Sequence, residues 1–576
     1  MKADDFRPTD EQKAIILHDG HAFVQACPGA GKTRTMVERA RHLLTSGTDR
    51  RAVAFLSFTN AAVDELAARL ASFGALPAPL FPGFIGTFDR FLWQFLIAPF
   101  GVEGCSQIPR LVPDKKDWEI RPFDGAQALT LRCFDRSTGA IILGKAAETG
   151  FAPRNGPKAW ETVARKVIAN SLTEGRLDFD DVRDCVRHRL EDKGFAARVG
   201  AALASRFREI VVDEAQDCNP TDLEIITWLR ASGIVVKIIC DPNQAIYGFR
   251  GGLTNQLQAF ADTFEPGHRL PMSGNFRSSP AICAAISQLR PPASRTTADK
   301  PLGRYKNEAE PVYVLAYGGT SVSPAIGAKF QEMAMGLGIA SDDAPLLAST
   351  WASASNAVGR KMVGAGQDKT LLLAEAVMGF LYAFEAGNRR EALSRLHRVV
   401  LLIRGHIANV GAYSTHLTKP EHEGGRWREE VIRIGQALRV KIGEPEDQWL
   451  ARARGMLDHD LAGGSTIGQR LKRHAKLATA LATTEATALP ARTIHSVKGL
   501  EFPAVCVVLT PRTAGGILDV LTGTTTDPQL TEDARKIYVA ASRAERLLAI
   551  AIPNSRVVGF KRVLGDGGNA VTVVSL

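Results

Sequence analysis

A glycine-rich turn between an apolar run and an amphipathic stretch constrains this chain more than any other feature. The run His21–Ala26 is short and apolar, as expected for a buried strand, and "CPGAGKT" (27–33) follows it directly. Residues 34–44 then have the apolar spacing of an amphipathic helix. A strand, a glycine turn and a helix in this order form a phosphate-binding loop, the P-loop. The sequence therefore predicts an α/β domain built around a nucleotide site.

The residues of this loop have separate expected roles. Backbone N–H groups and the amino end of the helix would hold phosphate oxygens. Lys32 would pair with the β and γ phosphates, and Thr33 would ligate Mg²⁺. The first position of the usual pattern is glycine, and here it is Ala26. The loop residues expected to contact the nucleotide are Gly29, Ala30, Gly31, Lys32 and Thr33.

A second apolar run ends in two acids that suit the other half of such a site. Residues 209–212 have a buried-strand pattern, and Asp213 and Glu214 follow at once. Acids at the carboxyl end of a parallel strand lie beside the P-loop in α/β folds. We expect Asp213 to bind Mg²⁺, directly or through water, and Glu214 to polarise the attacking water. These features predict an ATPase whose purpose they do not specify.

Composition narrows the setting of this ATPase. The chain has 576 residues, enough for about four domains of roughly 150 residues each. Its net charge of +10 mildly favours a phosphate-rich partner such as nucleic acid. No two of the eight cysteines form a C-x-x-C pair, so zinc and iron–sulfur sites have no support. Without a secretory leader or an apolar run of about 18 residues, we expect a cytoplasmic protein with no membrane partner.

Further blocks indicate what the hydrolysis is for. In chain order they are "PTDEQ" (8–12), "SFTNAA" (57–62), "GTFDRF" (86–91), "DPNQAIYGFRGG" (241–252), "GNFRSSP" (274–280), "RTIHSVKGLEF" (492–502) and "RKIYVAASRAERLL" (535–548). Together with the P-loop and the acid pair, these blocks resemble the superfamily 1A DNA helicases of the UvrD/Rep/PcrA type. The resemblance covers the two motor cores and not the segments inserted between the motifs. It implies an α/β fold of two RecA-like parallel-sheet domains, each with a mainly helical insertion.

The resemblance also implies nucleotide contacts outside the P-loop. Gln12 corresponds to the glutamine that reads adenine, and Arg34 would lie along the base and ribose. Phe276 stands where an aromatic ring stacks on the adenine. Glu501 would bind the ribose.

Three more residues are implied in hydrolysis. Gln244 would sense the γ-phosphate and link it to the DNA groove. Arg277 and Arg543 would reach the γ-phosphate from the second core, as an arginine finger does. The expected catalytic set is therefore Lys32, Asp213, Glu214, Gln244, Arg277 and Arg543.

The DNA-binding side is implied in the same way. Single-stranded DNA is held by stacked aromatic rings and by contacts to its backbone. By resemblance, Phe58, Tyr247 and Phe249 form base pockets. Arg250, Thr87 and His495 would contact the strand or its neighbours. The implied set is Phe58, Thr59, Asn60, Thr87, Tyr247, Phe249, Arg250 and His495. Asp89 departs from the family, which usually has histidine there, and an acid would repel a nearby phosphate.

The motif positions divide the chain into two cores with one insertion each. The first core comprises 1–90 and 201–273, with a helical insertion at 91–200. The second core comprises 274–370 and 486–576. Its insertion, 371–485, also has helical periodicity and is short for this family.

The favoured function is an ATP-dependent DNA helicase and translocase that uses ATP and Mg²⁺. It would move 3′ to 5′ on single-stranded DNA and act at junctions with duplex DNA. The alternative is a DNA-sensing ATPase subunit that regulates a partner nuclease, as in a Gabija-type anti-phage complex, and a repair-protein partner also stays open. A P-loop protein unrelated to helicases is disfavoured, since an ABC ATPase would need an "LSGGQ"-type signature that the chain lacks.

Overall fold

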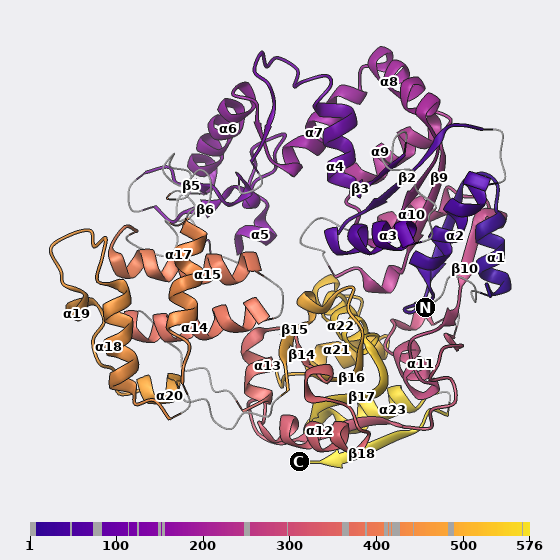
Figure 1. The fold of residues 1–576 in the computed structure, drawn as a ribbon. Coiled ribbons are helices and arrows are strands. Elements are labelled where there is room, and N and C mark those ends of the chain that lie inside the picture. The colour runs from indigo at the N-terminus through magenta and orange to yellow at the C-terminus, as the bar shows by residue number, and fades with distance from the viewer. Residues whose placement is uncertain are drawn as a thin grey trace.

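The chain folds into two α/β cores, each joined to a smaller lobe, in the computed structural model of Figure 1. The structure describes residues 7–45, 49–72, 83–112, 115–123, 126–147, 151, 156–246, 254–295, 298–359, 368–385, 389–407, 413, 416, 427–441, 443–481, 489–566 and 568–576. Within these ranges, no helix combines the length and the apolar character that a bilayer crossing requires.

The first core is built on a parallel sheet. Its six strands in the described ranges have the order β10-β1-β9-β8-β2-β3, and every ladder between them is parallel. They are β1 (Ala22–Ala26), β2 (Ala52–Ser57), β3 (Phe84–Thr87), β8 (Phe207–Val212), β9 (Val235–Cys240) and β10 (Arg269–Met272). Strands such as β2 are buried along their whole length, because helices cover both faces of a parallel sheet. These helices are α1 (Asp10–Leu17), α2 (Lys32–Thr45), α3 (Asn60–Ser72), α4 (Phe88–Leu92), α9 (Pro220–Ala231) and α10 (Thr254–Asp262).

The strand ends of this sheet gather the sequence motifs. Because parallel strands run in one direction, their carboxyl ends share one edge of the sheet. The P-loop follows β1, Asp213 follows β8, and the segment that begins with Asp241 follows β9. Ser57 ends β2, and Thr87 ends β3. The motifs thus lie along one edge although they are dispersed in the sequence.

The first insertion is a mixed lobe. It contains α5 (Leu143–Ala147), α6 (Lys158–Thr173), α7 (Phe179–Leu190), α8 (Lys193–Arg206), a π-helical turn at Trp93–Ile97, and the short strands β4 (Arg110–Leu111), β5 (Glu119–Ile120), β6 (Leu129–Thr130) and β7 (Arg176–Leu177). An ion pair connects this lobe to the first core. Arg183 of α7 donates from Nε to Asp222 Oδ1 of α9 at 2.7 Å and also pairs with Asp89 of α4. The acid at position 89 therefore binds the insertion.

The second core repeats the parallel arrangement. Its six strands among the described residues have the order β15-β14-β16-β17-β13-β18, again with parallel ladders only. They are β13 (Val312–Tyr317), β14 (Leu346–Ala348), β15 (Ala491–Thr493), β16 (Phe502–Val508), β17 (Ala544–Pro553) and β18 (Val571–Ser575). The flanking elements are α11 (Pro280–Gln288), α12 (Ala325–Gly336), α13 (Trp351–Ala357), α21 (Ala514–Leu521), α22 (Pro528–Ala541), α23 (Val557–Gly565) and the pair β11 (Gly274–Asn275) and β12 (Lys300–Pro301). The predicted fold class, α/β with two RecA-like parallel-sheet cores, is confirmed.

All regular elements of the second insertion are helices among its described residues. It consists of α14 (Lys369–Glu385), α15 (Arg389–Arg404), α17 (Trp427–Ala437), α18 (Glu446–Leu457), α19 (Ile467–Arg470) and α20 (Leu477–Leu481). Trp449 is fully buried in its centre with Phe380. Gly435 lets α17 approach α14, since a Cβ there would come within 2.2 Å of the Phe380 ring. This lobe has an apolar core of its own.

A buried ion pair fixes the helix that follows the P-loop. Arg39 of α2 donates from Nη2 to Glu209 Oε2 of β8 at 2.8 Å, and both side chains are 3% exposed. Arg39 also donates to Glu209 Oε1 and to the carbonyl of Ile16. The middle of α2, about two turns beyond Lys32, is thereby held against the sheet.

We expect Arg39→Met to lower the free energy of unfolding by about 3–5 kcal/mol, because it leaves the Glu209 carboxylate buried without its partner. The double variant Arg39→Met/Glu209→Leu should regain most of that loss, since it removes both charges. Urea unfolding followed by circular dichroism measures both. A single variant as stable as the native chain would contradict a buried, mutually dependent pair.

Candidate active site between the two cores

Two glycines give the P-loop its shape. Gly29 and Gly31 have φ of 68° and 74°, in the left-handed region that side chains disfavour. A Cβ on Gly29 would also lie 2.6 Å from Asn275 Oδ1 and 2.7 Å from the Cβ of Arg277. The loop thus packs against the start of the second core, and the N–H of Phe276 donates to the Gly29 carbonyl at 2.9 Å. The predicted phosphate loop lies where both cores meet.

Lys32 faces the acid pair that follows β8. Its Nζ is 3.9 Å from Glu214 Oε1, and the two side chains are 13% and 20% exposed. Burial opposes the charge of Lys32, but the carboxylates of Glu214 and Asp213 keep its pKa above the usual value. Burial and the charge of Glu214 raise the pKa of Asp213 to about 7, with a further contribution from Glu65. Lys32, Asp213 and Glu214 therefore form one electrostatic group.

Glu214 has a strained backbone. Its φ of 55° and ψ of 36° lie in the left-handed region, which Asp460 alone shares among the other described non-glycine residues. Such strain costs on the order of 1–3 kcal/mol and tends to occur at functional sites. The carboxylate is oriented by Gln216, whose Nε2 donates to Glu214 Oε2 at 2.5 Å. The strain and this hydrogen bond aim Glu214 toward Lys32.

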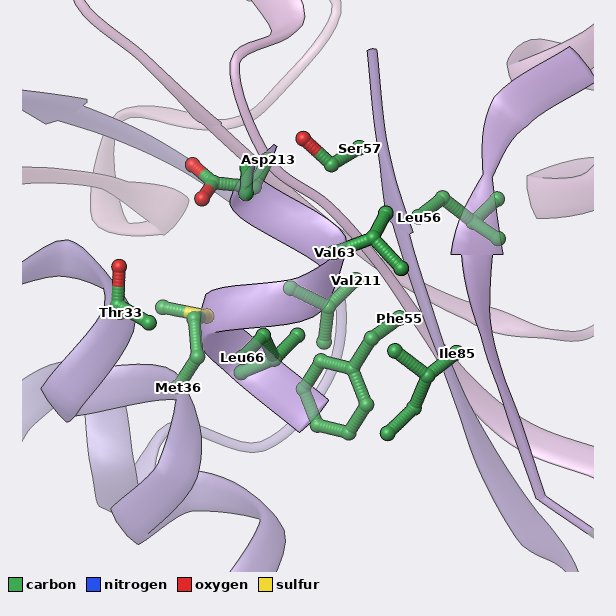
Figure 2. A pocket seen from close by; sticks show the side chains of 11 residues that line it. Thr33, Met36, Phe55, Leu56, Ser57, Val63, Leu66, Ile85, Val211 and Asp213 are labelled. Carbon is green, nitrogen blue, oxygen red and sulfur yellow. The ribbon is translucent and has the colours of Figure 1, made fainter. Parts of the chain in front are cut away.

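The oxygen groups around Thr33 suit Mg²⁺. Thr33 in the first turn of α2 and Asp213 line the same pocket (Figure 2). Mg²⁺ prefers hard oxygen ligands, and it is usually held by one or two carboxylates together with phosphates and waters. The hydroxyl of Thr33 and the carboxylate of Asp213, with Glu214 and Glu65 adding negative charge, fit that preference. In the described part of the chain no cluster of three His, Cys, Asp or Glu side chains forms an all-protein cage, and this mode of binding needs none.

The second core contributes two guanidinium groups to the cleft. Arg543 donates from Nη2 to Gln244 Oε1 of the first core at 2.7 Å. Arg277 donates to the Ser542 carbonyl at 2.8 Å and pairs with Glu501 at 2.5 Å. Burial and the nearby charge of Arg277 lower the pKa of Arg543 to about 10. The two arginines that the sequence predicts are thus brought together opposite the P-loop.

Other contacts across the cleft were not predicted from the sequence. Lys498 pairs with Asp217 at 2.5 Å, and this ion pair is almost fully buried. Asp241 accepts from the Tyr538 hydroxyl of the second core at 3.0 Å, and within its own core it accepts from Gln244 Nε2 at the same distance. The available signal was that Lys498 lies inside a motif block, between His495 and Glu501.

The sequence also matches known families over both cores. Residues 8–265 match the family described as the UvrD/REP helicase N-terminal domain, and residues 470–555 match the UvrD-like helicase C-terminal domain. The chain belongs to the UvrD/Rep family of DNA helicases.

Curated relatives of this UvrD-type helicase are named as DNA helicases. One is the ATP-dependent DNA helicase UvrD2 of Mycobacterium tuberculosis, 24% identical, with 96% of this chain and 79% of the relative covered. Another is the putative ATP-dependent DNA helicase YjcD of Bacillus subtilis, 24% identical over 48% of this chain and 37% of the relative. DNA helicase II of Haemophilus influenzae is 25% identical over 48% of this chain. The match covers 39% of that relative. The chain therefore spans well under half the length of YjcD and of DNA helicase II.

Three residues outside the P-loop that are expected to bind the nucleotide lie close to it. Gln12 is 2% exposed, its Nε2 donates to the Ala30 carbonyl at 3.0 Å, and its Oε1 caps the first turn of α1. Phe276 is 36% exposed and lies beside Gly31. Arg34 pairs with Glu38 on the next turn of α2. The adenine and ribose roles implied for these residues and for Glu501 stay predictions.

The predicted DNA residues of the first core lie at the carboxyl ends of β2 and β3. Phe58 stacks on the buried Phe88 with ring centroids 5.6 Å apart. Thr87 caps α4 by accepting from the N–H of Arg90, and Thr59 accepts from Ala62 in the first turn of α3. Asn60, the first residue of α3, is exposed. These residues occupy neighbouring positions on one edge.

The remaining DNA residues divide between two situations. Tyr247, Phe249 and Arg250 lie outside the described residues, so their predicted roles are unchanged. His495 of the second core is half-buried, and burial lowers its pKa while a hydrogen bond to the backbone of Ile246 opposes this. His495 therefore contacts the first core directly before residue 247.

We expect Glu214→Gln to reduce the rate constant of ATP hydrolysis by about 10²–10⁴-fold, the usual contribution of a positioned general base. The affinity for ATP should change little, because the amide keeps the shape of the side chain. Steady-state ATPase assays and nucleotide binding by fluorescence measure the two quantities.

Glu430→Gln is the matched control, since it removes the same charge in the second insertion, where Glu430 pairs with Arg404. Turnover retained by Glu214→Gln would remove Glu214 from the role of base.

Proposed function

We propose that this chain is an ATP-dependent helicase that moves 3′ to 5′ along single-stranded DNA and separates duplex DNA at a junction. The observation that carries this proposal is the hydrogen bond from Arg543 to Gln244 between the two cores. It joins the second core to the first within the network of Lys32 and Glu214. A γ-phosphate that draws on these groups would alter the contact between the cores.

The nucleotide end of the proposal uses groups of both cores. Lys32 would neutralise the phosphates, and Arg277 and Arg543 would stabilise the charge that develops during transfer to water. Thr33 and Asp213 would hold Mg²⁺, which neutralises phosphate charge when it is bound. Glu214 would then accept the proton of the attacking water.

The link to DNA runs through a short segment of the first core. Asp241 and Gln244 take part in the cleft contacts, and the chain reaches Ile246 two residues later. His495 of the second core bonds the backbone of Ile246. A change at Gln244 would therefore reach Ile246, directly before Tyr247 and Phe249, the expected base-stacking residues.

The 3′ to 5′ direction is inferred from the resemblance to the family. A DNA-sensing subunit that regulates a nuclease would use the same ATPase and the same DNA grip, so it is tested together with the favoured function. The two differ in whether the purified chain separates strands by itself.

We expect the purified chain to unwind a duplex with a 3′ single-stranded tail and to leave a blunt or 5′-tailed duplex intact. Strand displacement is followed by fluorescence in the presence of ATP and Mg²⁺, with ATPase measured in parallel with and without single-stranded DNA. DNA-stimulated hydrolysis without strand separation would favour the regulatory subunit. Hydrolysis indifferent to DNA would contradict both functions.

Phe58→Ala should weaken binding of a fluorescent oligothymidylate by about 1–3 kcal/mol, the usual contribution of one stacked base. Anisotropy titration measures this loss. Tyr313→Ala is the control, because Tyr313 is a half-buried aromatic residue at the amino end of β13 in the second core. Equal loss in both variants would indicate that Phe58 acts through the fold.

A further inference from the structure

The hydroxyl of Ser57 is buried without a hydrogen-bond partner. Ser57 ends β2, is 4% exposed, and its Oγ finds no donor or acceptor among the described residues. Buried hydroxyls are nearly always hydrogen-bonded, so an exception calls for an explanation such as an ion or a water that binds there.

The strand register directs this hydroxyl to the nucleotide side of the sheet. Leu56 pairs with Val212 in the parallel ladder of β2 and β8, and the N–H of Asp213 donates to the Leu56 carbonyl at 2.8 Å. Ser57 and Asp213 therefore occupy equivalent positions on neighbouring strands and point to the same face. Figure 2 shows both side chains on the rim of one pocket, with Thr33 across from them.

The rest of this pocket offers the hydroxyl no partner. Its floor is formed by Phe55, Val211 and Ile85, which lie one or two residues before the ends of their strands, and by Met36 and Leu66 from the covering helices. Since the floor is apolar, the polar groups of the pocket are confined to its rim. Ser57, Thr33 and Asp213 are thus the groups that could share a hydrated ion there.

We propose that Ser57 is a positioning residue for the Mg²⁺ that accompanies the nucleotide. Mg²⁺ gives up its waters reluctantly and usually keeps several of them when it binds protein and phosphate. The Ser57 hydroxyl would accept a hydrogen bond from one of these waters. Outer groups of this kind orient the inner ligands and tune the affinity for the metal.

This inference rests on one part of the proposed function, the assignment of Thr33 and Asp213 to Mg²⁺. It does not depend on strand separation or on DNA. A chain that binds the nucleotide with Mg²⁺ but unwinds nothing would overturn the helicase proposal and leave the role of Ser57 intact.

The test measures nucleotide binding without turnover. A fluorescent non-hydrolysable ATP analogue is titrated into the full chain at increasing Mg²⁺ and, separately, in EDTA. We expect Ser57→Ala to raise the Mg²⁺ concentration for half-maximal binding by about tenfold, the lower end of the effect of losing an outer-shell group. Its affinity for the analogue in EDTA should stay within about twofold of the native chain, because the inferred contact is made only through the hydrated ion.

Two further variants make the result specific to the hydroxyl. Ser57→Thr keeps the hydroxyl and should restore the native Mg²⁺ dependence. Ser355→Ala is the matched control, since Ser355 in α13 is 1% exposed and its Oγ also has no partner in the described part of the chain. It should leave the Mg²⁺ dependence unchanged.

Two outcomes would overturn the proposal. A Ser57→Ala chain with the native Mg²⁺ dependence would show that the hydroxyl does not serve the ion. An equal loss of affinity with Mg²⁺ and in EDTA would show that the hydroxyl acts on the fold or on the nucleotide directly. Should Ser57→Ala fail to fold, Ser57→Cys keeps the side-chain volume, replaces the hydroxyl by a weak acceptor and is judged by the same two criteria.

Discussion

Parallel strands end together, and in the first core this common edge is where the residues predicted to bind the nucleotide and DNA lie. The strands are buried on both faces, so side chains along them pack in the core and leave little room for polar groups. The edge is different, because each strand gives way to a loop or a helix start whose backbone N–H groups are not used by the ladder. Lys32, Asp213 and Gln244 all lie in segments that follow strands at this edge. The second core contacts this edge of the first sheet.

The charges of the cleft are balanced between the two cores. Lys32 lies with two carboxylates on the first core, whereas Arg277 and Arg543 bring like charges together on the second. Burial and the charge of Arg277 lower the pKa of Arg543, although the carboxylates of Glu214, Glu501 and Asp241 act in the opposite direction. A triphosphate between the cores would add negative charge beside both guanidinium groups and so favour their charged forms. A ligand with several negative charges, such as ATP, would therefore stabilise the contact between the two cores.

The sequence predicts what is local and misses what is distant. Lys32 and Asp213 could be assigned because each follows a strand-like run, and the order of the motifs was enough for the fold class. The pair Asp217–Lys498 could not be found in this way, since its members are 281 residues apart and each alone resembles a surface charge. Asp89 was expected to avoid DNA for its charge, yet its partner Arg183 became visible only when the insertion was seen packed on the core.

The left-handed backbone at Glu214 lowers the stability of the fold at a residue that the proposed activity needs. Glycine would adopt a φ of 55° without steric strain. Even after its larger loss of chain entropy on folding, it would raise the free energy of unfolding by roughly 1 kcal/mol. It would also remove the carboxylate beside Lys32. A search for more stable sequences by fold alone would therefore select against the proposed base. The proposed role as base would account for a residue other than glycine at this position.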